Sequence, residues 1–189
     1  LTFSVILYPH FLEAGKQFYL SIIASLAVVK ILDRYSKGIS VKWPNDIYLM
    51  DDKIAGILIE NVIRGNNLDA SVVGIGININ EDPMPEWLGA TSLRQATGKE
   101  YSLTALLHEF LFELRTLYND LKNEKSDNLK KAYESRLYFT GKTSVFEMKE
   151  MIIRADIQGI NDYGQLILTL SDGSNLVCSM DEVNWKQFI

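Results

Sequence analysis

The chain has 189 residues, 47% of them hydrophobic and 23% charged, which suits one full domain, or one domain with a small appendage, around a real core. Its formal net charge of −5 argues against a general nucleic-acid binder. Its single cysteine, Cys178, excludes an internal disulfide and a cysteine-based zinc site, and is consistent with the reducing cytoplasm where we expect the protein to act.

The amino-terminal part predicts a strand followed by a buried helix. Residues 1–8 alternate apolar and polar, and they end before Pro9, which cannot extend a strand ladder. Over residues 13–35 the apolar residues keep helical spacing around most of the circumference. The most apolar run lies between Lys16 and Lys30, which is too short to cross a bilayer, so no membrane partner is expected.

The central part predicts strands joined by tight turns. Asp51-Asp52 marks one turn, and residues 64–67 form a hairpin-type loop. On the last strand, Val73, Ile75 and Ile77 share one face by the period of two, while the opposite face carries glycines and then asparagines. The predicted strands cover residues 40–43, 47–49, 53–62 and 68–79.

The carboxy-terminal part divides into helices and then short strands. After a loop at 81–91, the spacing predicts helices over residues 103–121 and 127–137. Beyond Gly141 the pattern changes to short strands, so we place a domain boundary near 140, between a domain of residues 1–140 and a small all-β domain of residues 141–189. The predicted short strands cover residues 143–148, 152–158, 164–170 and 175–180.

The segment 41–60 carries the most chemistry. Its Trp43-Pro44-Asn45-Asp46 stretch alone would be a strand-ending turn, and Lys42 and Lys53 alone would be surface cations. Together they place two cations, amide donors and a carboxylate within one strand-turn-strand unit. That combination favours a site for phosphate or carboxylate groups.

Three successive motifs in this chain resemble the signatures of biotin protein ligases. They are Lys42-Trp43-Pro44-Asn45-Asp46, the strand from Lys53 to Leu58, and Gly74-Ile75-Gly76-Ile77-Asn78. The resemblance implies an α/β (α+β) fold, with a mixed β-sheet catalytic domain backed by helices and a small C-terminal SH3-like β-barrel.

The resemblance also implies an ATP-dependent reaction in two steps. Biotin is activated as biotinyl-5′-AMP and is then transferred to a lysine of a biotin carboxyl carrier domain, as in a biotin–[acetyl-CoA-carboxylase] ligase. ATP and biotin would be the substrates, with Mg²⁺ neutralising the triphosphate.

Residue roles carried over from the family fall into three groups. The catalytic residues would be Lys53 and Asp46. Strict alternation places Lys53 on the opposite face from Gly56 and Leu58, which is in tension with a shared site. The residues implied to bind biotin are Lys53, Gly56 and Leu58. Those implied to bind ATP or the adenylate are Lys42, Asn45, Asp46, Gly76 and Asn78.

No resident metal site is expected. His108-Glu109 begins like a zinc-protease motif but lacks the second histidine. Gly74-x-Gly76 lacks the third glycine of a dinucleotide fingerprint and is followed by no helix pattern.

One departure from the family leaves alternatives open. The family's glycine- and arginine-rich loop before the first strand has no match here, and we expect it upstream of Leu1. The alternatives are a truncated, non-catalytic biotin-binding fragment and a lipoate ligase-like acyl-adenylate enzyme. Exposed edge strands make a homodimer possible.

Overall fold

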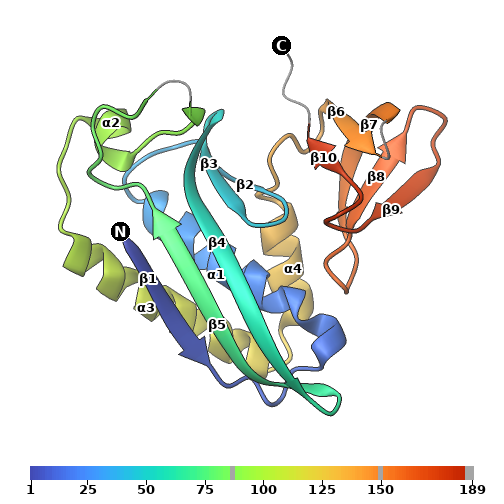
Figure 1. The fold of residues 1–189 in the computed structure, drawn as a ribbon, viewed down its shortest axis with the longest axis horizontal. Coiled ribbons are helices and arrows are strands. Elements are labelled where there is room, and N and C mark those ends of the chain that lie inside the picture. The colour runs from blue at the N-terminus through green and yellow to red at the C-terminus, as the bar shows by residue number, and fades with distance from the viewer. Residues whose placement is uncertain (86–87, 149–150, 186–189) are drawn as a thin grey trace.

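The computed structural model describes residues 1–85, 88–148 and 151–185. Its larger sheet has the strand order β1-β5-β4-β3-β2 (Figure 1). Every ladder in it is antiparallel, so the α+β class is confirmed but the expected mixed pairing is absent from the ladders. Short turns join most of these strands, whereas parallel neighbours need long crossovers. The strands are β1 (Thr2–Leu7), β2 (Ile39–Lys42), β3 (Asp46–Leu49), β4 (Asp52–Arg64) and β5 (Asn67–Ile77).

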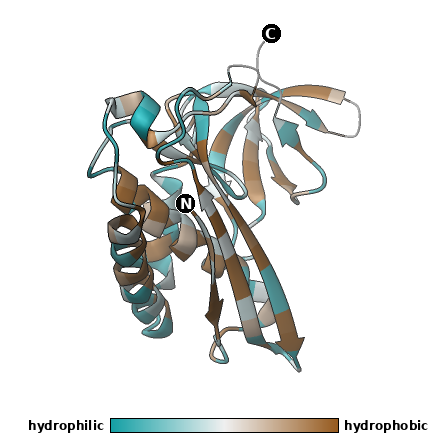
Figure 2. Cartoon of the chain, turned by 60° about the vertical axis from the view of Figure 1, so that its left-hand side comes forward, coloured by the Kyte–Doolittle hydropathy of each residue, from teal (hydrophilic) through white to brown (hydrophobic). Residues whose placement is uncertain are grey.

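The main helices cover one face of this sheet (Figures 1 and 2). The central helix α1 (Phe18–Leu32) is buried around almost its whole circumference, as its apolar sequence predicts. The segment Ala14–Leu32 is long and apolar enough to cross a membrane, but here it forms the protein core. The remaining helices are η1 (Ala14–Lys16), α2 (Leu93–Thr97), α3 (Leu103–Lys122) and α4 (Ser126–Glu134).

The opposite face of the sheet carries no helix within the described ranges. Along the long strands, hydropathy alternates in bands (Figure 2), because every second side chain points at the helices. On the open face Leu58 is 66% exposed and Ile6 is 58% exposed. Small and polar residues occupy much of the rest of this face, which leaves its backbone accessible.

The second sheet is small, antiparallel and ordered β10-β6-β7-β8-β9, as expected of an SH3-like barrel. Its core is apolar, and burial within it raises the pKa of the Cys178 thiol, so the thiol stays protonated and unreactive. Because the sheet begins at Thr143, we keep residue 140 as the proposed domain boundary. The strands are β6 (Thr143–Met148), β7 (Met151–Ile160), β8 (Leu166–Leu170), β9 (Asn175–Cys178) and β10 (Asn184–Trp185).

The turn between β7 and β8 fastens the small sheet to the large domain. The buried indole of Trp43 donates a hydrogen bond of 2.9 Å from Nε1 to the carbonyl oxygen of Gly164. Gly164 has a φ of +80°, and a Cβ there would lie 2.0 Å from Cγ of Phe18. Trp43 therefore links the central motif to the second sheet, which a local pattern could not reveal.

An ion pair beside this turn makes the contact sensitive to pH. Nζ of Lys130 on α4 lies 2.7 Å from Oδ1 of Asp162. This hydrogen bond lowers the pKa of Asp162. Burial is the largest single influence on Lys130 and lowers its pKa, but the hydrogen bond and the attraction of Asp162 and Glu134 together outweigh burial, so the pKa of Lys130 is raised. The carboxylate therefore stabilises the fold above its ordinary pKa of 3.8, and the ammonium stabilises it below its ordinary pKa of 10.5.

We expect Asp162→Asn to lower the stability slightly at neutral pH, by less than about 1 kcal/mol because the carboxylate is mostly exposed. As the pH falls through the lowered pKa of Asp162, the wild-type carboxylate is protonated and the two proteins should converge. Melting temperatures measured for both proteins from pH 3 to pH 8 check this. A difference that stays constant down to pH 3 would contradict the pairing.

Candidate active site

One row of residues crosses all five strands on the open face. The register pairs Lys42 with Asp46, Asp46 with Gly56, Gly56 with Gly76, and Gly76 with Thr2. Neighbouring strands lie about 4.8 Å apart, so the row spans about 19 Å from the cation to the hydroxyl. The row thus begins with the charged side chains of Lys42 and Asp46, continues over two glycines without side chains, and ends at the hydroxyl of Thr2.

The glycines of this face form the floor of a shallow hollow of about 370 Å³. A Cβ on Gly74 would lie 3.4 Å from the carbonyl oxygen of Leu58 and 3.7 Å from Oγ of Ser4. Thr2 and Ser4 of β1 border the hollow opposite Asp46 and Lys53. A flat ligand could lie on this backbone between hydroxyls on one side and charges on the other.

A β-bulge brings Lys53 to this face. In the pairing of β3 with β4, Ile47 faces Ala55 while Tyr48 faces Lys53, so Ile54 is an extra residue on β4. Ile54 and Ala55 are both buried, and Lys53 and Gly56 therefore share the open face. Strict alternation wrongly placed Lys53 opposite Gly56 and Leu58.

Lys53 and Asp46 form the charged centre of the hollow. Nζ of Lys53 lies 2.5 Å from Oδ1 of Asp46, and the two side chains are 42% and 24% exposed. A Cβ on Gly56 would lie 3.4 Å from Nζ of Lys53 and 3.6 Å from Oδ1 of Asp46. The absence of a side chain at Gly56 thus leaves room directly beside the ion pair for a ligand.

Lys42 lies on the same face with different neighbours. Its Nζ donates a hydrogen bond of 3.0 Å to the hydroxyl of Tyr48. Because Lys42 is one strand away from Asp46 in the row, the structure brings both sequence-predicted lysines to one side of the sheet. Neither Tyr48 nor the hydroxyls of β1 had been predicted as site residues, although the polar face of β1 was visible in its alternation.

Both predicted asparagines are tied to backbone, and of the two Asn45 borders the hollow whereas Asn78 does not. Asn45 donates from Nδ2 to the carbonyl oxygen of Ile57, 3.0 Å away, where the ladder of β3 and β4 ends. Asn78 donates from Nδ2 to the carbonyl oxygen of Thr91, 3.1 Å away. Thr91 in turn donates from its backbone nitrogen to the carbonyl oxygen of Lys53. Asn78 is therefore connected, through Thr91, to the strand that carries Lys53.

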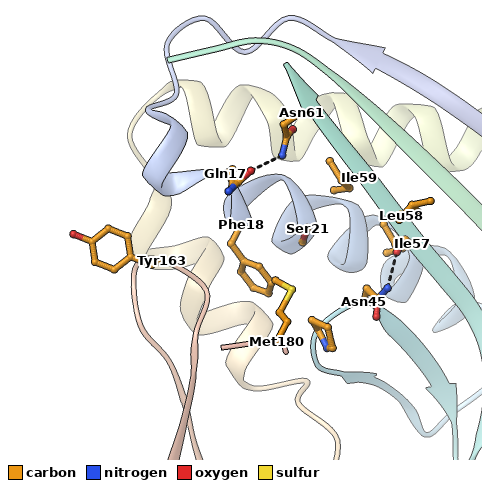
Figure 3. A pocket seen from close by; sticks show the side chains of 11 residues that line it. Gln17, Phe18, Ser21, Asn45, Ile57, Leu58, Ile59, Asn61, Tyr163 and Met180 are labelled. Atoms are coloured by element: carbon orange, nitrogen blue, oxygen red, sulfur yellow. Dashed lines mark hydrogen bonds between the residues drawn. The ribbon is translucent and has the colours of Figure 1, made fainter. Parts of the chain in front are cut away.

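A second hollow of about 310 Å³ lies on the other side of the ladder end (Figure 3). Asn45 borders both hollows. The second hollow is also lined by Phe18 of α1 and by Met180, which follows shortly after the end of β9. None of its lining residues is charged. The anion chemistry predicted from the two lysines therefore belongs to the open-face hollow.

On the role that the family resemblance implies for Asn78, we expect Asn78→Ala to raise the KM for ATP several-fold and to leave the KM for biotin unchanged. The physical reason is that the resemblance places the Asn78 amide near the nucleotide, and its removal also breaks the hydrogen bond to the carbonyl oxygen of Thr91 in the loop after β5. Steady-state kinetics with each substrate varied in turn measures this. Equal effects on both substrates, or none on ATP, would remove Asn78 from the nucleotide side.

Comparison with known proteins agrees with this geometry. The model of the Biotin/lipoate A/B protein ligase family matches residues 1–78. The bifunctional ligase/repressor BirA of Bacillus subtilis is 30% identical over 168 residues, which are 86% of this chain and 51% of that protein. The biotin protein ligase of Aquifex aeolicus, solved in complex with biotin and ATP, superposes with a TM-score of 0.82 at 26% identity, covering 100% of this chain and 78% of that one.

The chain belongs to the biotin protein ligase family. The similarity to BirA of Escherichia coli is more local, at 40% identity over 62 residues, or 32% of this chain and 19% of that protein. The chain spans about half the length of the Bacillus BirA proteins that it matches. Membership explains why the family's motif residues gather on one face, while the roles of those residues remain our proposals.

Proposed function

We propose that this chain carries the catalytic part of an ATP-dependent ligase that activates biotin as biotinyl-5′-AMP and transfers it to a lysine of a biotin carboxyl carrier domain. The observation that supports this most directly is the Lys53 ammonium beside Asp46 over the bare backbone of Gly56. A cation fixed above a floor of glycines suits a reaction in which two anions must approach each other closely.

In the first step, a carboxylate oxygen of biotin attacks the α-phosphorus of ATP, and the bond to the β-phosphate breaks to release pyrophosphate. Negative charge builds on the phosphorus oxygens, and the ammonium of Lys53 would stabilise it. The biotin ring would lie over Gly56 against Leu58, whose side chain is exposed on this face. Gly76, Lys42 and the two asparagines would border the nucleotide.

In the second step, the amine of the carrier lysine attacks the acyl carbon of the mixed anhydride, and AMP leaves with the bridging oxygen. Asp46 lies between Lys42 and Gly56 in the row across the sheet, so its carboxylate would meet the incoming ammonium group and orient it. This assignment gives Asp46 and Lys53 separate tasks within one ion pair.

Magnesium is assigned to the nucleotide rather than to the protein. The described residues contain no cluster of three or more histidine, cysteine, aspartate or glutamate side chains that could hold a metal ion. The ion would therefore arrive with ATP and neutralise part of its triphosphate charge. The other proposed properties are cytoplasmic localisation and a carrier domain as protein partner, and a homodimer remains a prediction.

The decisive experiment measures biotin-dependent exchange of labelled pyrophosphate into ATP, with Mg²⁺ present, followed by labelling of a purified carrier domain. Exchange with biotin but not with lipoate is expected, together with biotin transfer to the carrier lysine. Exchange that requires lipoate would instead favour the lipoate ligase alternative. Biotin binding without any exchange would favour the non-catalytic alternative.

A further inference from the structure

The two lysines of the open face differ in how their charge is compensated. Lys53 is paired with the carboxylate of Asp46. Lys42 has no carboxylate within ion-pair distance among the residues that the structure describes. Its Nζ lies instead 4.8 Å from the ring centroid of Tyr48 and 5.7 Å from that of Trp185. Lys42 is thus a cation surrounded by aromatic faces.

Trp185 comes from the second sheet and is held there by other rings. It lies on β10, where it pairs with Phe146 of β6, and the two ring centroids are 4.9 Å apart. Tyr138, in the connection between the domains, lies 5.9 Å from Trp185 and 5.1 Å from Tyr48. The cluster of Tyr48, Tyr138 and Trp185 therefore joins the two sheets around Lys42.

Tyr138 is fixed in this cluster by its hydroxyl. It donates a hydrogen bond of 2.8 Å to Oδ1 of Asp51. Burial, and then the neighbouring carboxylate of Asp51, raise the pKa of Tyr138 above its ordinary value, so the hydroxyl keeps its proton. Trp185, in contrast, buries its Nε1 without a hydrogen-bond partner among the described residues. A buried N–H group without a hydrogen-bond partner costs free energy, so we attribute the contribution of Trp185 at this position to its ring face.

Aromatic faces hold a cation without neutralising it, because the ring quadrupole attracts the charge but carries none of its own. Lys42 therefore keeps a full positive charge, fixed on the open face one strand away from the ion pair of Asp46 and Lys53. A cation in that state suits an extended polyanion better than a single carboxylate, which already has Lys53 as its partner.

We propose that Trp185 is a positioning residue, which together with Tyr48 holds Lys42 as an uncompensated cation for the β- and γ-phosphates of the nucleotide. The small carboxy-terminal sheet thereby takes part in triphosphate recognition. This inference rests on the proposed function, which places ATP on the open face.

The test compares binding of MgATP and AMP to the wild-type protein and to Trp185→Leu, by calorimetry. Leucine keeps an apolar side chain but removes the ring face, so MgATP binding should weaken about five- to tenfold. AMP lacks the outer phosphates and its affinity should change less than twofold. Trp185→Phe, which retains a ring, should restore most of the MgATP affinity. Equal weakening for MgATP and AMP would reduce Trp185 to a packing role and overturn the proposal.

A double-mutant cycle shows whether Trp185 acts through Lys42. Lys42→Gln alone should weaken MgATP binding at least as much as Trp185→Leu. In the Lys42→Gln background, Trp185→Leu should add less than a twofold effect, and a full additional effect would overturn the proposal. Leu168→Ala, in the core of the second sheet, is the control for general loosening of that sheet and should leave MgATP affinity unchanged.

Pyrophosphate exchange by the wild-type protein tests the proposed ligase function separately from the role of Trp185. Biotin-dependent exchange together with normal MgATP binding by Trp185→Leu would overturn only the role of Trp185. Absence of biotin-dependent exchange in the wild-type protein would overturn the proposed function, whatever Trp185 does.

Discussion

Replacing Lys53 by alanine is expected to abolish adenylate formation while leaving the fold intact. The ammonium is the cation nearest to the glycine floor, and it would face the charge that develops on the α-phosphate. Removal of one fixed donor to a developing anion commonly costs about 10²–10³-fold in rate, and the loss of a full charge should cost at least as much. The side chain is 42% exposed, so its removal leaves no buried cavity.

Biotin-dependent pyrophosphate exchange and the melting temperature measure the two parts of this prediction. Lys37→Ala is a matched control, because Lys37 is an exposed lysine outside the hollow. It should leave both quantities unchanged. If Lys53→Ala retained normal exchange activity, Lys53 could not hold the central role.

The second large effect is expected at the contact between the two sheets. Gly164→Ala would put a methyl group 2.0 Å from Cγ of Phe18, on a backbone whose φ of +80° disfavours any side chain. The strained backbone costs about 1–2 kcal/mol, and relief of the clash must displace the turn that accepts the hydrogen bond of Trp43. We expect a total loss above about 3 kcal/mol, or a fall in Tm of about 6–12 °C.

Gly173→Ala separates the two causes of this loss. Gly173 has a φ of +82°, almost the same as Gly164, but a Cβ there would meet nothing within 4 Å. Thermal unfolding should therefore show the backbone penalty alone for Gly173→Ala and a much larger fall for Gly164→Ala. Equal losses would mean that the contact with Phe18 is easily relieved.

Most of the elements could be predicted because their signals are local. The helix at 103–121 corresponds to α3 (Leu103–Lys122), and the strand at 143–148 coincides with β6 (Thr143–Met148). The helix at 13–35 shortens to α1 (Phe18–Leu32), since its first turn forms the separate η1 (Ala14–Lys16). Two elements were not predicted, the five-residue α2 (Leu93–Thr97) and the two-residue β10 (Asn184–Trp185), because neither is long enough to show a period.

The candidate site was predicted only in part, since its remaining features arise from pairing between distant segments. The motif residues Asp46, Lys53 and Gly56 do share one face. Their arrangement nevertheless depends on a bulge that is defined only by the pairing with β3. Thr2 joins the site through its pairing with Gly76, and Trp185 through the packing of the second sheet. Neither contact leaves a local pattern in the sequence.

The bulge at Ile54 makes the face on which Lys53 lies depend on the strand pairing as well as on the sequence of β4. If β3 and β4 paired without the bulge, Ile54 and Ala55 would both stand in regular alternation between Lys53 and Gly56, and Lys53 would turn towards the helices although every residue of the site would still be encoded. Deletion of Ile54, in contrast, would leave one residue between Lys53 and Gly56, so a regular strand would keep both on the open face. A family alignment that places a one-residue gap at Ile54 would therefore join proteins whose lysines point to the same side of the sheet.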